Sequence, residues 1–226
     1  MANFCIYMLL NCDKGHLKVN FSIYIQIAIL GNPTFALISY MQNSYFEDQI
    51  FEKISVIEPG EYDHCLFKNC AFESADFKNF KFLDCQFELC NVSLVQLSGA
   101  SLQKVHFADC KMQGLRFEAC NPFLFEVSFE RCSLNLSSFY QVKTKGTSFL
   151  NCQLQEVDFT EAHFPKAIFD NCDLSGALFD HTNLIEADFR TAHSYEINPS
   201  INQIKKAKFS SDGLAGLLQS FGISIS

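Results

Sequence analysis

The sequence predicts an all-β fold, a four-sided β-solenoid that is closed at its C-terminal end by a short α-helix. Two rows of residues carry this prediction. With a two-residue insertion after residue 117, every twentieth position is phenylalanine: Phe67, Phe87, Phe107, Phe129, Phe149, Phe169, Phe189 and Phe209. Three residues farther along, the same spacing gives cysteine at each position from Cys70 to Cys172. A period this strict is typical of solenoids, in which each coil stacks on the one before.

A finer period of five residues divides each coil. Large apolar residues recur at every fifth position from Phe67, and a second, usually small residue stands two positions before each of them, as in Cys65, Ala162 and Ala187. The other three positions of each five are mostly polar. Neither the helical period of 3.6 nor the strand period of 2.0 produces this pattern. Five residues a side and twenty a coil imply four sides, with two inward side chains on each.

Short units within this stretch resemble a known family of repeats. They read Ala-Asp-Phe at 75–77 and 187–189, Val-Asp-Phe at 157–159 and Cys-Asp-Leu at 172–174, and they resemble pentapeptide repeats. The resemblance covers residues 65–190, and the twenty-residue spacing extends it to Phe209. It implies a right-handed quadrilateral β-helix, which we expect to occupy residues 41–209.

Composition and charge narrow the class of function. The 226-residue chain is 48% hydrophobic and has a net charge of −8, so it is neither disordered nor basic in the way expected of a nucleic-acid-binding protein. An acidic surface leaves a basic protein partner open. The cysteines of the repeats occupy the small inward position, where buried reduced thiols are favoured over disulfides, and such thiols suit a cytoplasmic protein. A metal site among them is disfavoured because no Cys-x-x-Cys pair occurs.

Residues 1–40 do not follow the repeat and form an atypical apolar N-terminal extension. Residues 19–41 contain no charged side chain, but Gln26, Asn32 and Pro33 interrupt the apolar run. A bilayer span needs about 20 mostly apolar residues, so no membrane partner is expected unless residues 19–41 span it. Three interpretations remain open: an extension outside the functional fold, a membrane or export segment, and a packed N-terminal cap.

Two irregular segments interrupt the solenoid. Residues 42–66 form a degraded first coil, in which Phe46 and Phe51 are candidates to cover the open end. Residues 118–127 contain the insertion, where Asn121 and Pro122 signal a turn. The register after the insertion is intact, so this segment is expected to bulge outward, either as a tolerated surface bulge or as a contact loop.

The period changes again at the C-terminus, where residues 210–226 are expected to form a cap and a dimer contact. Four apolar residues have the i, i+3, i+4, i+7 spacing of one helix face: Leu214, Leu217, Leu218 and Phe221. Ser210, Ser211 or Asp212 could cap the start of this helix, and Gly222 stands at the C′ position. Ile223 and Ile225 then alternate with serine, which predicts a short strand that could pair with a second copy of the chain.

Catalytic and cofactor motifs are absent from the sequence. No His-Glu-x-x-His, Gly-x-Ser-x-Gly, P-loop or Gly-x-Gly-x-x-Gly pattern occurs. The histidines from His64 onward fall at outward repeat positions and are interpreted as solvated. The chain is therefore predicted to be a binding protein and not an enzyme, with no catalytic residue, no metal and no cofactor.

One acidic stretch stands out on the predicted surface. Residues 147–190 carry eight acidic residues against two basic ones, which gives −6 in 44 residues. The candidate partner-binding residues are Glu156, Asp158, Asp170, Asp173, Asp180 and Asp188. This charge could serve solubility alone, or it could attract a basic partner.

The layout of the chain also resembles one functional group within the pentapeptide-repeat family, the quinolone-resistance (Qnr-type) gyrase-binding members. That resemblance implies a tail-to-tail homodimer that imitates duplex DNA and binds DNA gyrase or topoisomerase IV. Drug-protecting members often carry longer loops, whereas this chain has only the bulge at Asn121 and Pro122, so topoisomerase binding is favoured over protection from quinolones. The alternative is a structural or adaptor solenoid with an unrelated protein partner.

Overall fold

The computed structural model describes residues 6–7, 24–25 and 44–223, which belong to two compact units, residues 1–44 and residues 45–226. In the first unit, strands β1 (Ile6–Tyr7) and β2 (Tyr24–Ile25) pair antiparallel, with Ile6 opposite Ile25. The rest of the predicted extension lies outside the described residues. Among the residues that are described, no helix is long and apolar enough to cross a membrane.

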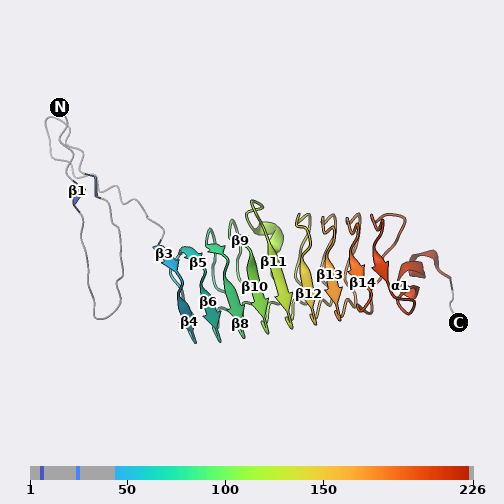
Figure 1. The fold of residues 1–226 in the computed structure, drawn as a ribbon, viewed down its shortest axis with the longest axis horizontal. Helices are drawn as coiled ribbons and strands as arrows, with labels where there is room; N and C mark the ends of the chain where they lie inside the picture. The colour runs from blue at the N-terminus through green and yellow to red at the C-terminus, as the bar shows by residue number, and fades with distance from the viewer. Residues whose placement is uncertain (1–5, 8–23, 26–43, 224–226) are drawn as a thin grey trace, which may run out of the picture. The chain divides into compact units, whose positions relative to one another are not determined.

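The second unit is the predicted right-handed four-sided β-solenoid, whose coils follow one another along the rod in Figure 1. One side is a nine-stranded parallel sheet, in which each strand pairs with the equivalent strand of the next coil. In chain order its strands are β4 (Ile50–Glu52), β6 (Leu66–Lys68), β8 (Gln86–Glu88), β10 (Val105–Ala108), β11 (Val127–Glu130), β12 (Ser148–Leu150), β13 (Ile168–Asp170), β14 (Asp188–Phe189) and β15 (Lys208–Phe209).

The other three sides are also paired from coil to coil. A four-stranded sheet is made of β3 (Ser44–Glu47), β5 (Gly60–Asp63), β7 (Lys81–Leu83) and β9 (Ser101–Gln103), and single parallel bridges from Lys143 to Gln203 continue this side in the later coils. One further row of bridges runs from Ala71 to His193, and another passes through Arg116, Ser138 and Asp158. Four rows of pairing confirm the four sides that the five-residue period predicts.

The phenylalanine row forms a continuous ladder inside the rod. Phe67 lies opposite Phe87 in the sheet, and the ring centroids of successive rungs from Phe51 to Phe209 are 4.5 to 5.6 Å apart in near-parallel orientation. A second ladder of stacked rings joins Phe117, Phe139, Phe159 and Phe179. Stacked, offset aromatic pairs add to the burial of the rings themselves, so these ladders are the core of the fold.

The cysteines take the small inward positions, as predicted. All nine between Cys65 and Cys172 are buried, and thiols of the row that begins at Cys70 donate weak hydrogen bonds to the preceding coil, for example Cys90 to the carbonyl of Phe67 at 3.4 Å. Burial raises the pKa of the Cys120 thiol to about 12. A thiol with a raised pKa stays protonated at neutral pH, so Cys120 is expected to be chemically inert.

The corners of the solenoid rest on residues in the left-handed backbone conformation. Asn69, Asp84, Asn151 and Asn171 adopt φ values between 49° and 54°, and most corners hold a residue of this kind. Asparagine and aspartate tolerate this conformation best among residues with a side chain, but Leu89, Lys104 and other residues also adopt it at corners, so the winding imposes it on residues of several types.

The first coil covers the open end of the core, as predicted. Phe46 stacks on Tyr62 with ring centroids 4.7 Å apart, and Phe51 stacks on Phe67 at 5.0 Å. Phe51 pairs with Phe67 only sixteen residues later, because this coil is four residues shorter than the others. The two rings shield the first regular coil from water.

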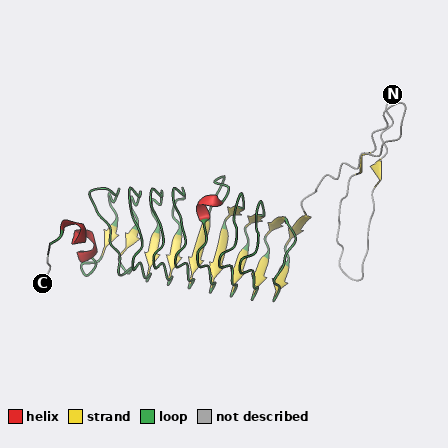
Figure 2. Ribbon diagram, turned by 180° about the vertical axis from the view of Figure 1, so that it is seen from behind, coloured by secondary structure: helices red, strands yellow, loops and turns green. Residues whose placement is uncertain are grey.

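The other end of the rod is closed by a helical segment, which Figure 2 shows beyond the last strand. It consists of α1 (Ala215–Leu218) followed by the 3₁₀-helix η2 (Gln219–Phe221). The prediction of one helix across residues 214–221 is therefore wrong in length, because only four residues are α-helical. Gly222 does adopt the left-handed C′ conformation expected of it, with φ of 63°.

Candidate protein-binding surface

The six predicted acidic residues lie on three sides and one corner of the rod. Asp170 in β13 and Asp188 in β14 belong to the nine-stranded sheet. Asp173 lies in the row of bridges that ends at His193, and Asp158 lies in the row that continues to Leu178, with Asp180 two residues beyond Leu178. Glu156 occupies a corner, with φ of 55°. The structure thus distributes these charges around the rod and does not bring them into one stripe.

Several of these carboxylates are held by the backbone that follows them. Oδ1 of Asp158 accepts a hydrogen bond from the N–H of Thr160 at 2.8 Å, and Oδ1 of Asp173 accepts one from the N–H of Ser175 at 3.0 Å. Asn183 makes the same turn with the N–H of Ile185 at 3.1 Å. Aspartate and asparagine favour this side-chain turn, so part of the acidic pattern has a structural cause.

The acidic residues differ in how far ion pairs offset their charge and hydrogen bonds occupy their carboxylate oxygens. The guanidinium of Arg190 donates to Asp188 at 2.7 Å and, with Lys208 nearby, lowers the pKa of this carboxyl to about 2. Partial burial opposes ionisation of Asp173, but hydrogen bonds from Ser175 and Gln155 hold its pKa below the usual range. Asp180 lies 2.5 Å from the ring nitrogen of His181. Within residues 44–223, Glu156 has no such partner, so its charge is the most available to a ligand.

In the later coils, from Lys143 onward, the fourth side of the rod carries exposed lysines. Lys143 begins the row of bridges that passes through His163 to Gln203, and Lys145 follows it at the same side. Lys205 continues that side in the last coil, and Lys206 lies at the next corner with φ of 60°. All four lysines are exposed and make no ion pair within residues 44–223. The six predicted acidic residues and these four lysines therefore face different directions around the later coils.

The insertion forms an outward bulge between two intact coils (Figure 2). It follows the 3₁₀-helix η1 (Phe117–Ala119), and Oδ1 of Asn121 accepts the N–H of Phe123 at 3.0 Å. Pro122 lies within the turn, and the register is restored where the N–H of Glu126 reaches the carbonyl of Leu102. The bulge leaves Phe123 67% exposed and Leu124 63% exposed. The five-residue period resumes at residue 124 after the insertion and so predicts Leu124 as an inward residue. That prediction is wrong: Leu124 lies in the left-handed conformation at the exposed tip, and Phe125 is buried in its place.

The C-terminal cap presents only part of the predicted apolar face. Leu217 packs against the core, and Leu218 is half-buried. Leu214, Phe221 and Ile223 remain 48 to 55% exposed. Ile225 lies outside the described residues, so the predicted strand of Ile223 and Ile225 stays a prediction.

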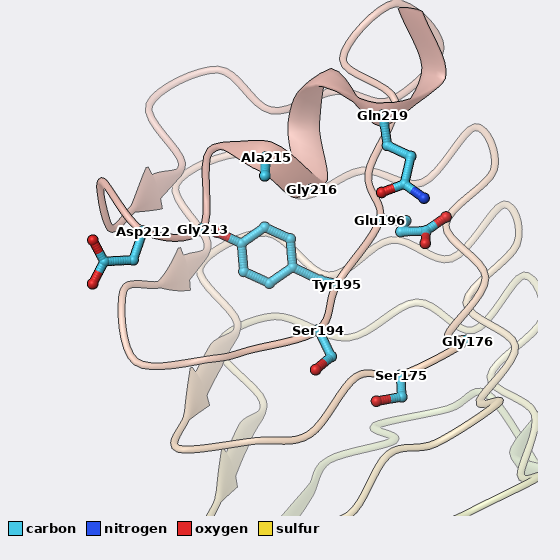
Figure 3. A pocket seen from close by; sticks show the side chains of 10 residues that line it. All are labelled: Ser175, Gly176, Ser194, Tyr195, Glu196, Asp212, Gly213, Ala215, Gly216 and Gln219. Carbon is cyan, nitrogen blue, oxygen red and sulfur yellow. The ribbon is translucent and has the colours of Figure 1, made fainter. Parts of the chain in front are cut away.

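Two glycines explain how the cap sits so close to the last coil, as Figure 3 shows around Tyr195. A Cβ atom at Gly213 would lie 1.9 Å from the hydroxyl of Tyr195, and one at Gly216 would lie 2.0 Å from its carbonyl oxygen. The carbonyl of Gly216 in turn accepts the N–H of Ile197 at 3.0 Å. The two glycines lower the helix propensity of this segment but allow it to pack against Tyr195.

A pocket of about 400 Å³ lies between this cap and the last coil. It is lined by ten residues: Ser175, Gly176, Ser194, Tyr195, Glu196, Asp212, Gly213, Ala215, Gly216 and Gln219. The hydroxyl of Tyr195 is buried there without a hydrogen-bond partner, and burial raises its pKa. The lining offers hydroxyls and carboxylates but no histidine or cysteine, so it does not pair a nucleophile with a base of the kind used in acyl transfer.

The repeat geometry agrees with a match to a known family. A family model described as the pentapeptide repeat region matches residues 61–139 and 123–191, more than half of the chain. The chain belongs to the pentapeptide-repeat family. A search of curated proteins gives no match.

Solved pentapeptide-repeat structures share the fold of this chain. A trypsin-treated variant of QnrB1, described as a plasmid-mediated fluoroquinolone resistance protein, is 17% identical, with a TM-score of 0.50 over 80% of this chain and 91% of that one. HetL from the cyanobacterium Nostoc sp. strain PCC 7120, described as involved in the regulation of heterocyst differentiation, is 12% identical, with a TM-score of 0.46 over 76% and 90% of the two chains. At 17% identity the likeness to QnrB1 concerns the solenoid fold alone, so the function must be argued from the surface of this pentapeptide-repeat protein.

Proposed function

We propose that this solenoid is a protein-binding rod that imitates duplex DNA and binds DNA gyrase or topoisomerase IV. The observation that carries the proposal is its linear density of charge. Residues 147–190 have a net charge of −6, from eight acidic and two basic residues, and span about 2.2 coils, or about 11 Å of axis at the spacing of parallel strands. Duplex DNA carries one charge per roughly 1.7 Å, or about 6 charges over the same length.

The distribution of this charge also supports the proposal. The six predicted residues occupy three sides and a corner of a straight rod, so a groove that wraps around a duplex could contact several of them at once. The lysines on the fourth side then define the orientation, because a basic groove would repel Lys143, Lys145, Lys205 and Lys206.

The apolar residues at the C-terminus support a homodimer as part of the proposed function. Leu214, Phe221 and Ile223 are exposed beside the last coil, where a second copy could cover them. A dimer through residues 214–225 would join two rods end to end. The acidic stretch of residues 147–190, called the acidic band below, would then lie on each side of the junction, which doubles the length that a topoisomerase could contact.

The bulge offers a second type of contact. Phe123 and Leu124 stand off the rod with more than half of their surface exposed, and large exposed apolar side chains are common at protein interfaces. In this proposal the acidic band attracts the basic groove of the partner, and the bulge at Asn121 and Pro122 makes an apolar contact with it.

The test compares two variants that lose the same number of charges. In the first, Asp158, Asp170, Asp173, Asp180 and Asp188 become asparagine, which preserves the side-chain turns because Asn183 already makes one. In the control, Glu47, Asp48, Glu52, Glu73 and Asp76, all exposed and near the other end of the rod, become the corresponding amides. Binding to gyrase and inhibition of its supercoiling are measured at two salt concentrations.

The band variant should bind gyrase about 2–4 kcal/mol more weakly than wild type, since five exposed pairs are worth about 0–1 kcal/mol each. Its affinity should also depend less on salt, because the charges attract a groove over a Debye length of about 8 Å at physiological ionic strength. The control variant should bind like wild type. Equal binding by all three proteins, or none by wild type, would leave the structural or adaptor rod as the function.

A further inference from the structure

A histidine and two aspartates converge at one corner near the start of the regular coils. His64 follows β5 with φ of 52°, and Asp84 follows β7, one coil farther on, with φ of 49°. The N–H of His64 donates to the carbonyl of Leu83 at 3.0 Å, which stacks the two corners. Asp63, the last residue of β5, turns toward the same corner.

The ligand atoms of these three side chains are grouped as metal ligands are. One atom from each of Asp63, His64 and Asp84 lies within 4.8 Å of the other two. Ligands of a tetrahedral ion with bonds of about 2.0–2.2 Å are about 3.4 Å apart. Small rotations of three short side chains would therefore suffice to enclose an ion.

One carboxylate oxygen in the group is buried and accepts no hydrogen bond. This oxygen is Oδ1 of Asp63, although Nδ1 of His64 lies only 2.7 Å away. A buried carboxylate oxygen without a hydrogen bond is costly, and the one polar atom beside it is the imidazole nitrogen of His64. A metal ion bound by both atoms, after they separate to the ligand spacing given above, would satisfy this oxygen, because imidazole nitrogen and carboxylate oxygen are both ligands of first-row ions.

The neighbouring side chains do not supply that cation. Lys104 lies 3.6 Å from Oδ1 of Asp84, and its own side chain is 62% exposed. The hydroxyl of Tyr45 donates to Oδ2 of Asp63 at 3.1 Å and so fixes the carboxylate while leaving Oδ1 toward the corner. Outer-shell hydrogen bonds of this kind commonly orient metal ligands.

We propose that Asp63, His64 and Asp84 bind a divalent transition-metal ion such as Zn²⁺, with water completing the coordination. An imidazole nitrogen and two carboxylate oxygens suit a first-row ion better than Mg²⁺ or Ca²⁺, which prefer oxygen alone. Asp63 and His64 belong to one coil and Asp84 to the next. The ion therefore links two successive coils near the N-terminal end of the solenoid.

The chain contains its own control for this site. Asp180 and His181 repeat the same dipeptide, His181 has φ of 51°, and its Nδ1 lies 2.5 Å from Oδ1 of Asp180. Within the described part of the chain, only the corner of Asp63, His64 and Asp84 has a third ligand. Any binding that a histidine–aspartate pair alone produces would therefore appear at both places.

The experiment titrates full-length protein, stripped of metal with a chelator, with Zn²⁺ in a calorimeter. The variants are His64→Asn, Asp84→Asn and His181→Asn, since asparagine tolerates the left-handed corner in each case. Wild type and His181→Asn should bind one ion, whereas His64→Asn and Asp84→Asn should lose at least tenfold in affinity. Zn²⁺ should raise the melting temperature of the first two proteins only.

Two controls test whether each variant is folded and which side chains bind the ion. Melting without metal shows that each variant is folded, and Co²⁺ in place of Zn²⁺ should give a visible spectrum without a thiolate charge-transfer band, which excludes binding by the cysteines. The proposal is overturned if wild type shows no saturable binding, if Asp84→Asn binds as tightly as wild type, or if a thiolate band appears. These outcomes are independent of gyrase binding.

Discussion

Replacing one rung of the phenylalanine ladder tests the physical basis of the fold. Phe149 is fully buried, and its ring centroid lies 5.1 Å from those of both Phe129 and Phe169 in the adjacent coils. Phe139 and Phe159 contact it edge-on at 5.8 and 6.1 Å. The change Phe149→Ala therefore removes a ring that is in contact on every side.

The magnitude follows from how little the site can collapse. Removing a phenyl ring leaves a cavity of up to about 100 Å³, which costs about 2.4 kcal/mol at about 24 cal/mol per Å³, and the lost transfer free energy adds about 2 kcal/mol. The coils above and below are held by backbone hydrogen bonds, such as that from Ile168 to the carbonyl of Thr147 at 2.9 Å. We expect the upper part of the usual range of about 3–5 kcal/mol.

Urea unfolding followed by circular dichroism measures this loss as a shift in the transition midpoint at constant slope. Ile168→Ala is the matched control, because Ile168 lies in the neighbouring strand but is 42% exposed on the outer face. It should cost less than about 1 kcal/mol. A loss below about 1.5 kcal/mol for Phe149→Ala, or an equal loss in the control, would refute the inward assignment of the ladder.

Three further predictions concern the ends and the surface of the rod. Gly216→Ala should destabilise the cap despite a gain of about 1 kcal/mol in helix propensity, because its Cβ would lie 2.0 Å from the carbonyl oxygen of Tyr195. Faster amide hydrogen exchange at Ile197 would show this, with Ser220→Ala as the neutral control, and slower exchange would contradict it. The pKa of Asp188 is lowered to about 2 by Arg190, against about 3.9 in the unfolded chain. Stability is therefore lost as pH falls from about 4 to 2, and the loss should be smaller for Asp188→Asn in urea midpoints at pH 5 and 2.5; parallel profiles would argue against the ion pair. Light scattering should give about twice the chain mass of 25.7 kDa. Leu214→Ser with Phe221→Ser should halve the measured mass, and deletion of residues 211–226 should give monomer or aggregate, whereas a monomeric wild type rules out the dimer.

The side chains that point into the core could be predicted from the sequence alone. The positions of Phe67, Phe149 and Cys90 follow from the twenty-residue period, because a coil of constant length leaves each inward residue only one neighbour above and one below. The need of a solenoid to cover its first open coil made Phe46 and Phe51 candidates for that end. Within the regular coils no long-range information was needed, since each core contact there repeats a local rule.

The contacts of the outward-facing side chains and of the C-terminal cap were decided only by the tertiary structure. The period places His64 and Asp84 in one row, but only the folded corner shows that Asp63 turns into it with a buried oxygen. Likewise, helix propensity assigns Gly213 and Gly216 a purely destabilising role, whereas the docked cap shows that Tyr195 excludes any side chain there. The acidic residues read as one stretch in the sequence, yet the four-sided winding spreads Asp158, Asp173 and Asp188 over three sides. The period fixes which outward residues are neighbours from coil to coil, as for Lys81 and Glu61. It does not fix contacts across a corner or against the cap, which are decided by the turns and by what packs at the ends.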